Sequence, residues 1–232
     1  IYMFLNYYGY SRNEISVEFF GQETIKQGTY SVEYIGWSIP EDLKIRFPNQ
    51  SAFIERILPS VIKIYKETGI PWQFLTAQVC HESGYGKYEI VDIDTGEYSK
   101  NLFGIKYFGD TSDRNKYARA WTWEEIKPSE LGSWQVSHTE LVVGKTNSRG
   151  NLEINIIANF AKYASYEEAF NGYKKVLLNQ YFIHALRSSN DPVLYVKDLQ
   201  SELPGENHPK YALDSEYVRK ITDVMKMWKM IE

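Results

Sequence analysis

The sequence predicts a mainly α-helical, α+β fold in which a β-rich segment interrupts the helices near the middle of the chain. Apolar residues recur every three or four positions over residues 53–65, 166–177 and 217–228, which is the period of an amphipathic helix. Between Trp121 and Tyr163 apolar residues alternate instead, as in strands with one buried face. Helical patterns on both sides of this segment indicate one helical body with a β insertion.

The composition indicates a folded protein that does not bind nucleic acid. At 232 residues the chain exceeds the roughly 150 residues of a typical domain, so one large domain or a domain with an appendage is expected. Hydrophobic residues make up 43% and charged residues 24%, the balance of a globular protein. The net charge of -4 argues against the basic surface that nucleic acid requires. Aromatic residues reach 16%, and although most aromatic rings fill cores, flat rings also stack on the apolar faces of sugars.

The chain contains no targeting or membrane segment that its sequence reveals. The N-terminal stretch IYMFLNYYGYS lacks the basic and apolar regions of a signal peptide. No run of about 18 apolar residues follows it, so membrane insertion is not expected. Because the chain begins at Ile1, we interpret it as a piece of a longer protein. The single cysteine, Cys80, cannot form an intramolecular disulfide and therefore does not identify the compartment.

Residues 1–50 are expected to form an irregular or β-rich arm, because short alternations such as TYSVEYIGW predict strands. The helical period starts at Phe53, so a first helix is expected there, with Ser51 as its N-cap and Gly69 as its end. A second helix is expected over Pro71–Gly84, since a proline in the first turn loses no backbone donor that the helix needs.

A β-hairpin is expected in the middle of the chain, with TNSRG as its turn. The alternating residues are Trp134, Val136 and Val142 before the turn, and Leu152, Ile154 and Ile156 after it. Three helices are expected to follow. Ser165 and Glu168 have the spacing of a capping box, Asp191 and Pro192 open a short helix, and Asp214 caps the last one.

Glu82, in the stretch CHESGYGK, is the sharpest candidate for chemistry. It lies seven residues after Leu75 and three after Val79, so it is expected on their helical face, at the edge of the core. Partial burial disfavours the charged form of a carboxyl group and raises its pKa, which is the adjustment that a general acid needs near neutral pH. A glutamate before a helix-ending glycine is also common for structural reasons alone, so the pattern requires support from elsewhere.

Acid-catalysed cleavage of a glycoside uses a second carboxyl group, and the expected hairpin offers Glu140. On the expected strand WQVSHTELVV, Glu140 shares a largely apolar face with Trp134, His138 and Val142, where a solvated glutamate is not expected. The other glutamates of this region are expected to face solvent or to be structural: Glu124, Glu125, Glu130 and Glu153.

Metal and thiol chemistry are disfavoured by spacing. HESGY begins like the zinc motif HExxH, but Tyr85 occupies the second ligand position. The acidic stretch DIDTGE, residues 92–97, resembles a calcium loop, yet its glycine comes one place early. Cys80 and His81 are adjacent on a helix, so their side chains point about 100° apart and do not form a nucleophile pair. A metal site is therefore not expected from the spacing.

Four blocks in order give the chain a resemblance to a known family: CHESGYGK, NLFGIKYFG, FAKYASYEEAFNGY and KYALDSEYVRKI. Together they resemble the glucosaminidases of glycoside hydrolase family 73, found in bacterial autolysins, flagellar muralytic proteins and phage lysins. The resemblance covers residues 51–232, a predicted catalytic domain with a β insertion at about 106–160, and leaves residues 1–50 without a counterpart. It implies a lysozyme-like fold, with an α-lobe and a small β-hairpin lobe flanking a glycan groove. It also implies hydrolysis of the N-acetylglucosaminyl-β-1,4-N-acetylmuramic acid bond of peptidoglycan, with neither a metal nor an organic cofactor.

The resemblance also implies roles for individual residues. Glu82 matches the catalytic acid of the family, and Glu140 matches the hairpin glutamate of a Thr-x-Glu-aromatic pattern, with Leu141 in place of the aromatic residue. Tyr211 in YALD matches a tyrosine near the reaction centre, where a phenol could hydrogen-bond an N-acetyl group or a water. The remaining expected substrate-binding residues are Asn101, Leu102, Phe103 and Gly104 of the groove segment, together with Tyr85 and Tyr163.

Three alternatives stay open: a lytic transglycosylase or a muramidase on the same scaffold, or a catalytically inactive wall-binding module. The blocks NLFGIK and YALD favour a glucosaminidase over the first two, and the intact Glu82 and Tyr211 argue against the third. The expected partner is the glycan strand of peptidoglycan, with further wall-binding domains in a longer parent chain. The expected location is the bacterial cell wall, reached by secretion or carried by a phage.

Overall fold

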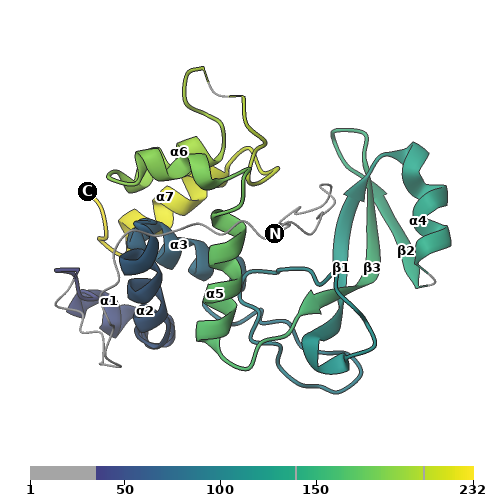
Figure 1. Cartoon of the computed structure of the whole chain (residues 1–232), viewed down its shortest axis with the longest axis horizontal. Helices are drawn as coiled ribbons and strands as arrows, with labels where there is room; N and C mark the ends of the chain where they lie inside the picture. Colours follow the sequence, from purple (N-terminus) through teal and green to yellow (C-terminus); the bar gives the residue numbers. More distant parts are fainter. Residues whose placement is uncertain (1–34, 139, 206) are drawn as a thin grey trace.

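The computed structural model describes residues 35–138, 140–205 and 207–232, and these form a helical body with a smaller three-stranded sheet beside it (Figure 1). Helices α1, α2, α3, α5, α6 and α7 make up the body, and α4 packs with the sheet. The strand expected in TYSVEYIGW lies almost entirely outside the described residues. The mainly helical fold with a β insertion is therefore confirmed.

The helical body begins earlier in the chain than predicted. Helix α1 spans Glu41–Arg46 and α2 spans Pro48–Thr68. Pro48 takes the first turn of α2, where its missing N–H costs no helical hydrogen bond. Ser51 consequently lies inside the helix, and the prediction that it is the N-cap was wrong. Gly69 ends α2 as predicted, in the left-handed conformation with a φ of 75°.

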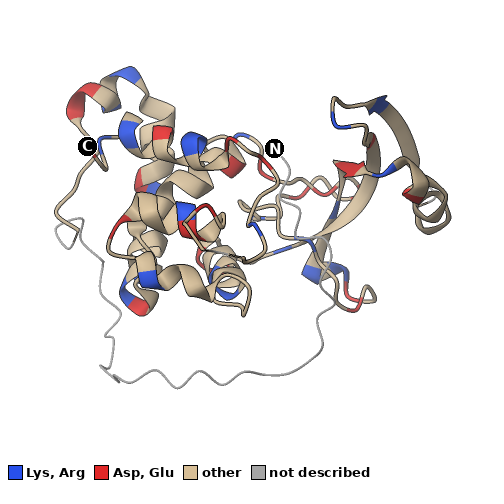
Figure 2. Ribbon diagram, turned by 90° about the horizontal axis from the view of Figure 1, so that it is seen from above, with Lys and Arg blue, Asp and Glu red and all other residues tan. Residues whose placement is uncertain are grey.

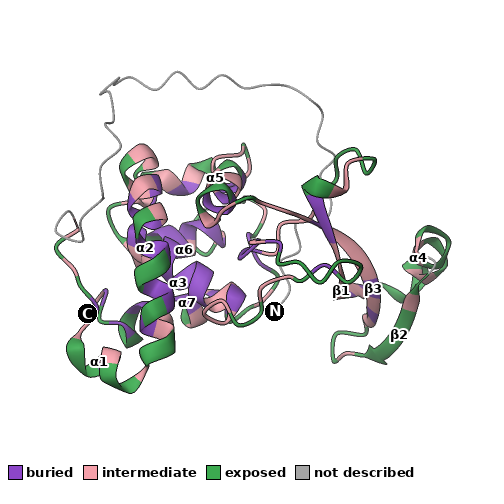
Figure 3. Ribbon diagram, turned by 90° about the horizontal axis from the view of Figure 1, so that it is seen from below, coloured by how far each residue is buried: buried purple, intermediate pink, exposed green. Residues whose placement is uncertain are grey.

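The main hydrophobic core also reaches residues before the first predicted helix. Ile39 and Leu43 are buried in it, and the boundary expected at residue 50 falls within α2. At the centre lies α3, Trp72–Ser83, which starts one residue after the predicted start and ends before a left-handed Gly84. Its side chains are buried almost all round, and α2, α6 and α7 pack against it (Figure 3). Apolar residues on every face suit a helix at the centre of a bundle.

The later helices begin close to where their caps predict. Helix α5, Tyr166–Leu177, has Ser165 at its N-cap, and the Ser165 hydroxyl accepts the Glu168 N–H at 3.1 Å. Helix α6, Pro192–Leu199, is capped by Asp191. The last helix, α7, spans Tyr217–Met227 and has Glu216 at its N-cap. The prediction that Asp214 caps α7 was wrong, because its carboxylate accepts from the Glu216 N–H in the preceding turn. The described residues also contain three short 3₁₀ helices: η2 Arg114–Lys116, η3 Pro128–Glu130 and η4 Ile183–Ser188.

The sheet is antiparallel, in the order β1-β3-β2. Its strands are β1 Tyr117–Ile126, β2 Leu141–Thr146 and β3 Leu152–Ala161. The predicted hairpin exists between β2 and β3, with its turn in TNSRG. Its first strand, however, starts at Leu141, because residues 131–137 form helix α4.

The helix at Leu131–Ser137 is a correction to the strand expected through Trp134 and Val136. Leu131 and Trp134, three residues apart, pack together on the second core cluster, which contains Ile126 of β1 and Ile154 of β3. Val136 is 87% exposed, so the alternation read from the sequence does not correspond to a buried strand face. The contact of Leu131 and Trp134 with this cluster, at helical spacing, therefore determines the local structure more than the alternation of Trp134 and Val136 does.

Basic and acidic residues are interspersed along the helices and the sheet (Figure 2). None of the helices in the described part of the chain combines the length and the apolar composition needed to cross a membrane. Within the same residues, no group of three acidic, histidine or cysteine side chains is arranged to hold a metal ion.

Candidate functional site

Glu82 lies in the last turn of α3 and is half-buried at the surface of the helical body. Its Oε1 accepts a hydrogen bond of 3.0 Å from Nε2 of Gln78, one turn earlier. Burial raises the pKa of Glu82 to about 7, and the hydrogen bond from Gln78 opposes this rise. A substantial fraction of this carboxyl group is therefore protonated at neutral pH.

A buried polar cluster lies next to Glu82. The Gln78 side chain is fully buried, and its Nε2 also donates to the hydroxyl of Tyr211 at 3.3 Å. Its Oε1 accepts from the hydroxyl of Tyr217 at 2.5 Å. The hydroxyls of Tyr211 and Tyr173 are 2.9 Å apart. Burial holds the pKa of each of these phenols well above its usual range, so they are neutral hydrogen-bonding groups.

Tyr211, expected to act on the substrate, is only 1% exposed. Its hydroxyl contacts Gln78 and Tyr173, and its ring packs edge-on against Phe182. The structure therefore brings Tyr211 close to Glu82, but connects the two through the Gln78 amide.

The expected groove segment, residues 101–104, turns its side chains inward. Asn101 Nδ2 donates to the carbonyl oxygens of Ile105 at 2.7 Å and Ala161 at 3.0 Å. The Asn101 Oδ1 accepts from the Ile105 N–H at 3.1 Å, so one buried amide joins the turn to the end of β3. Leu102 and Phe103 are buried, and the Phe103 ring stacks on Tyr173 at 4.0 Å. Gly104, in the left-handed region at a φ of 63°, is the part of the segment that remains partly accessible.

Tyr85 and Tyr163 are also directed largely toward protein. The hydroxyl of Tyr85 accepts a hydrogen bond of 2.9 Å from the indole N–H of Trp228, and its ring lies against Phe53. The Tyr163 side chain is partly buried and packs against the main hydrophobic core. Burial raises the pKa of both tyrosines to about 12.

Exposed aromatic side chains occur elsewhere, at positions that pattern analysis did not single out. Tyr88, Tyr98 and Phe108 project from the loops between α3 and β1, and Trp121 and Trp123 project from β1. Their signal in the sequence was the high aromatic content alone, which does not separate core rings from surface rings.

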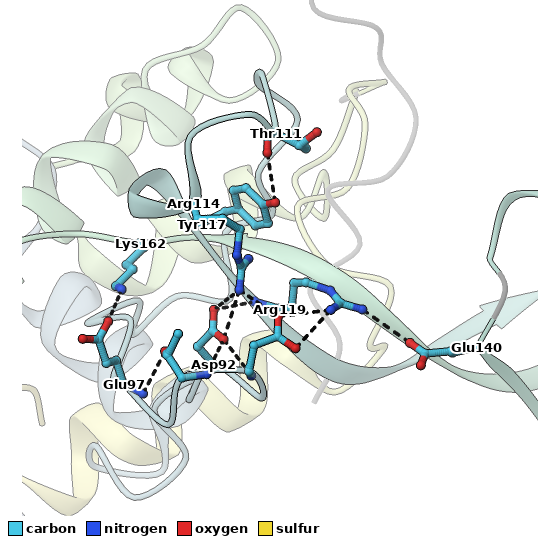
Figure 4. A network of polar contacts seen from close by, with 10 residues as sticks. Asp92, Glu97, Thr111, Arg114, Tyr117, Arg119, Glu140 and Lys162 are labelled. Carbon is cyan, nitrogen blue, oxygen red and sulfur yellow. Dashed lines mark hydrogen bonds and ion pairs between the residues drawn. The ribbon is translucent and has the colours of Figure 1, made fainter.

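Glu140 lies just before β2, and 55% of its side chain is exposed. Its expected place on a strand face with Trp134 and His138 is corrected by helix α4, which contains Trp134 and ends at Ser137. The carboxylate of Glu140 contacts Nη2 of Arg119 at 3.4 Å (Figure 4). Glu140 is therefore held on the sheet, where a β1 arginine contacts its carboxylate.

The acidic loop at residues 92–97 belongs to the same network (Figure 4). Asp92 is 2% exposed and accepts from the Arg114 guanidinium at 2.9 Å, while Asp94 contacts both Arg114 and Arg119. Glu97 pairs with Lys162 at 2.5 Å. Cations of the protein thus neutralise the carboxylates that resembled a calcium loop.

Glu124, which was expected to face solvent or to be structural, is 4% exposed on β1 and forms an ion pair with Lys106. Lys106 lies two residues after the groove segment, and its backbone pairs with that of Phe160 near the end of β3. In the antiparallel pairing of β1 with β3, Glu124 lies opposite Ile154, so its side chain is on the face of the sheet that carries the second core cluster. The pattern Thr122-Trp123-Glu124 repeats the Thr-x-Glu order that drew attention to Glu140. Sequence reasoning passed over Glu124 because a single glutamate in a strand pattern gives no sign of its burial.

Comparisons with known proteins agree on one family. A family described as glucosaminidase, mannosyl-glycoprotein endo-beta-N-acetylglucosaminidase, matches residues 58–230. The peptidoglycan hydrolase FlgJ of Pseudomonas aeruginosa is 29% identical over 184 residues, which are 79% of this chain and 38% of that protein. The peptidoglycan hydrolase FlgJ of Escherichia coli K12 is 25% identical over 84% of this chain and 52% of its own length. The chain thus spans about half or less of the length of these curated relatives.

A solved structure shares the fold. The catalytic domain of the autolysin Auto from Listeria monocytogenes superposes with a TM-score of 0.56 at 22% identity, covering 88% of this chain and 98% of that domain. At this identity the likeness concerns the fold alone, and it confirms the predicted lysozyme-like arrangement of helices with a small sheet.

Proposed function

The chain belongs to the glucosaminidase family, glycoside hydrolase family 73, and from this premise we propose that it hydrolyses peptidoglycan at the β-1,4 bond between N-acetylglucosamine and N-acetylmuramic acid. The relatives named above are peptidoglycan hydrolases and an autolysin, which supports the substrate class. We further propose that the parent protein acts on the wall outside the cell, with other wall-binding parts beyond this chain.

The observation that carries the proposal is the environment of Glu82. A general acid must hold a proton at the working pH and release it to the leaving oxygen as the glycosidic bond breaks. Half-burial at the end of α3, with a pKa of about 7, suits this task. In the proposed reaction, Glu82 protonates the glycosidic oxygen, and the cation-like sugar that forms is captured by water.

The second carboxylate is proposed to come from the sheet, and two residues compete. Glu140 stays a prediction from the family pattern, although its exposed carboxylate contacts Arg119. Glu124 has a buried carboxylate, and its ion pair with Lys106 lies beside the groove segment. A carboxylate shielded from water would interact more strongly with a developing positive sugar than an exposed one, and Thr122-Trp123-Glu124 has the same Thr-x-Glu order. Together these favour Glu124, although Lys106 offsets part of its charge.

A matched set of variants separates the two candidates. If Glu124 acts on the reaction, Glu124→Gln lowers hydrolysis of purified sacculi far more than Lys106→Met does, since both break the ion pair but only the first removes the carboxylate. Glu140→Gln is expected to have a small effect. If Glu140→Gln instead loses most of its hydrolytic rate while Glu124→Gln stays near the wild-type rate, Glu140 is the second carboxylate.

The bond itself is tested by digesting sacculi, reducing the products with borohydride and identifying the new end by mass spectrometry. Cleavage after N-acetylglucosamine yields N-acetylglucosaminitol. N-acetylmuramitol would instead identify a muramidase, and an anhydro sugar that resists reduction would identify a lytic transglycosylase. A folded chain that binds sacculi but releases no product would be a wall-binding module.

A further inference from the structure

The hydrogen bonds of the buried Gln78 amide define how it is oriented toward Glu82. Its Nε2 carries two hydrogens, which point to Glu82 Oε1 at 3.0 Å and to the Tyr211 hydroxyl at 3.3 Å. Its Oε1 accepts from the Tyr217 hydroxyl at 2.5 Å. Both ends of a fully buried amide are thus satisfied by partners from three parts of the chain: α3, the YALD segment and α7.

This orientation distinguishes the two oxygens of the Glu82 carboxyl group. Oε1 accepts the Gln78 N–H, and an oxygen that accepts such a bond acts as the carbonyl oxygen when the group is protonated. The acid proton then resides on Oε2, the oxygen that does not contact Gln78. Among the described residues, the bond from Gln78 is the one hydrogen bond that the Glu82 carboxyl group makes.

We propose that Gln78 is a positioning residue that keeps the acid proton of Glu82 on Oε2, and that Tyr217 holds the Gln78 amide in the orientation this requires. The proposal rests on the proposed function, in which Glu82 is the general acid. It concerns an action through Glu82, since Gln78 and Tyr217 are buried and do not reach a substrate.

Tyr217 is needed because a glutamine side chain can rotate by 180° and exchange its oxygen and nitrogen. Without the Tyr217 hydroxyl, the buried carbonyl oxygen of Gln78 loses its donor, and a buried acceptor without a partner is costly. Rotation restores a donor, because the Tyr211 hydroxyl can donate to the oxygen that now faces it. The same rotation places that oxygen beside Glu82, where it repels the carboxylate and accepts the acid proton.

Within the described part of the chain, the other groups around Glu82 do not supply this effect. Tyr211 and Tyr217 remain neutral, since burial holds the pKa of each well above its usual range. Tyr173 faces the Tyr211 hydroxyl. Lys220 and Asp214, which pair at 2.5 Å, act electrostatically on the neighbouring His81. A shift in the pKa of Glu82 in variants of Gln78 or Tyr217 would therefore arise from the loss or the rotation of the Gln78 side-chain amide.

The test titrates Glu82 directly, by NMR of the ligand-free chain labelled with ¹³C at the glutamate carboxyl groups. The Glu82 signal is assigned by its disappearance in Glu82→Gln. Gln78→Met removes the donor at similar volume, and Tyr217→Phe releases the amide, so each should raise the titration midpoint of Glu82 by about one pH unit. Tyr195→Phe is the matched control, because the Tyr195 hydroxyl is equally buried in the core and has no partner among the described residues.

Upward shifts in Gln78→Met and Tyr217→Phe, with none in Tyr195→Phe, would support the proposal, as would the same pattern in the alkaline limb of kcat at an unchanged KM. If the titration midpoint of Glu82 is unchanged in a folded Tyr217→Phe variant, the proposed role of Tyr217 is overturned. If it is unchanged in a folded Gln78→Met variant, the whole proposal is overturned. If one variant fails to fold, the other still tests whether the orientation of the Gln78 amide affects the titration of Glu82. The titration requires no substrate, so failure of the wild-type chain to cleave sacculi would reject the proposed function separately.

Discussion

Removing the charge of Glu82 is expected to stabilise the protein, and increasingly so as the pH rises. In the unfolded chain the carboxyl group ionises near its ordinary pKa of 4.5, whereas in the folded chain burial delays ionisation to about pH 7. Between these values the folded state binds more protons than the unfolded state. The free energy of unfolding therefore falls with rising pH over this window, and the loss is complete above the folded-state pKa.

The magnitude follows from the width of that window. One pH unit corresponds to about 1.4 kcal/mol, so the interval from 4.5 to about 7 corresponds to about 3 kcal/mol. Glu82→Gln removes the titrating group and keeps an amide of similar size. Relative to the wild type, the variant should gain little at pH 4.5 and about 3 kcal/mol at pH 8.

Urea denaturation of both proteins at intervals from pH 4.5 to 8.5 measures this difference. Glu124→Gln serves as a contrast, because it breaks a buried ion pair and should lose about 3 kcal/mol of stability instead. A constant difference between Glu82→Gln and the wild type across the whole pH range would refute the reasoning, since it would mean that Glu82 titrates alike in both states.

Four further outcomes are expected. Glu82→Gln should lower turnover on sacculi by about 10²–10⁴-fold with its circular dichroism spectrum unchanged, and near wild-type rates would remove Glu82 from the reaction. The kcat of the wild type should fall as the pH rises through about 7, because the acid must be protonated; a profile flat to pH 9 would contradict this. Tyr211→Phe should lower both turnover and the melting temperature, since its buried hydroxyl has two partners, and a loss of rate alone would indicate direct contact with the sugar. Asp191→Ala should cost about 1 kcal/mol in thermal or urea unfolding and leave turnover intact, because the Asp191 carboxylate caps α6.

The correct predictions from sequence depended on short-range chemistry. Gly69 ends α2, and Ser165 and Asp191 cap their helices through contacts within three residues. Glu82 likewise lies at the edge of the core because helical period and a helix-ending glycine are both local properties. Rules of this kind act over one or two turns of chain, so the sequence alone could state them.

Apart from the helix caps expected at Ser51 and Asp214, which were wrong by a few residues, the incorrect predictions concern residues whose neighbours come from distant parts of the chain. Trp134 and Val136 alternate like strand residues, yet they lie in helix α4, from which Trp134 packs on the cluster of Ile154 and Ile156. The alternation also suggested a buried Glu140, whereas the pairing of β1 with β3 instead buries Glu124 beside Lys106. Burial of a polar side chain depends on what covers it, and period alone does not contain that information.

The sequence by itself determined the helical body, the presence of a hairpin and Glu82 as the acid candidate. Tertiary structure decided how that acid is held. Gln78 is four residues from Glu82, but its other partners, Tyr211 and Tyr217, lie 133 and 139 residues away along the chain. Desolvation and hydrogen bonding, which set the pKa of Glu82, arise only when those segments close over α3.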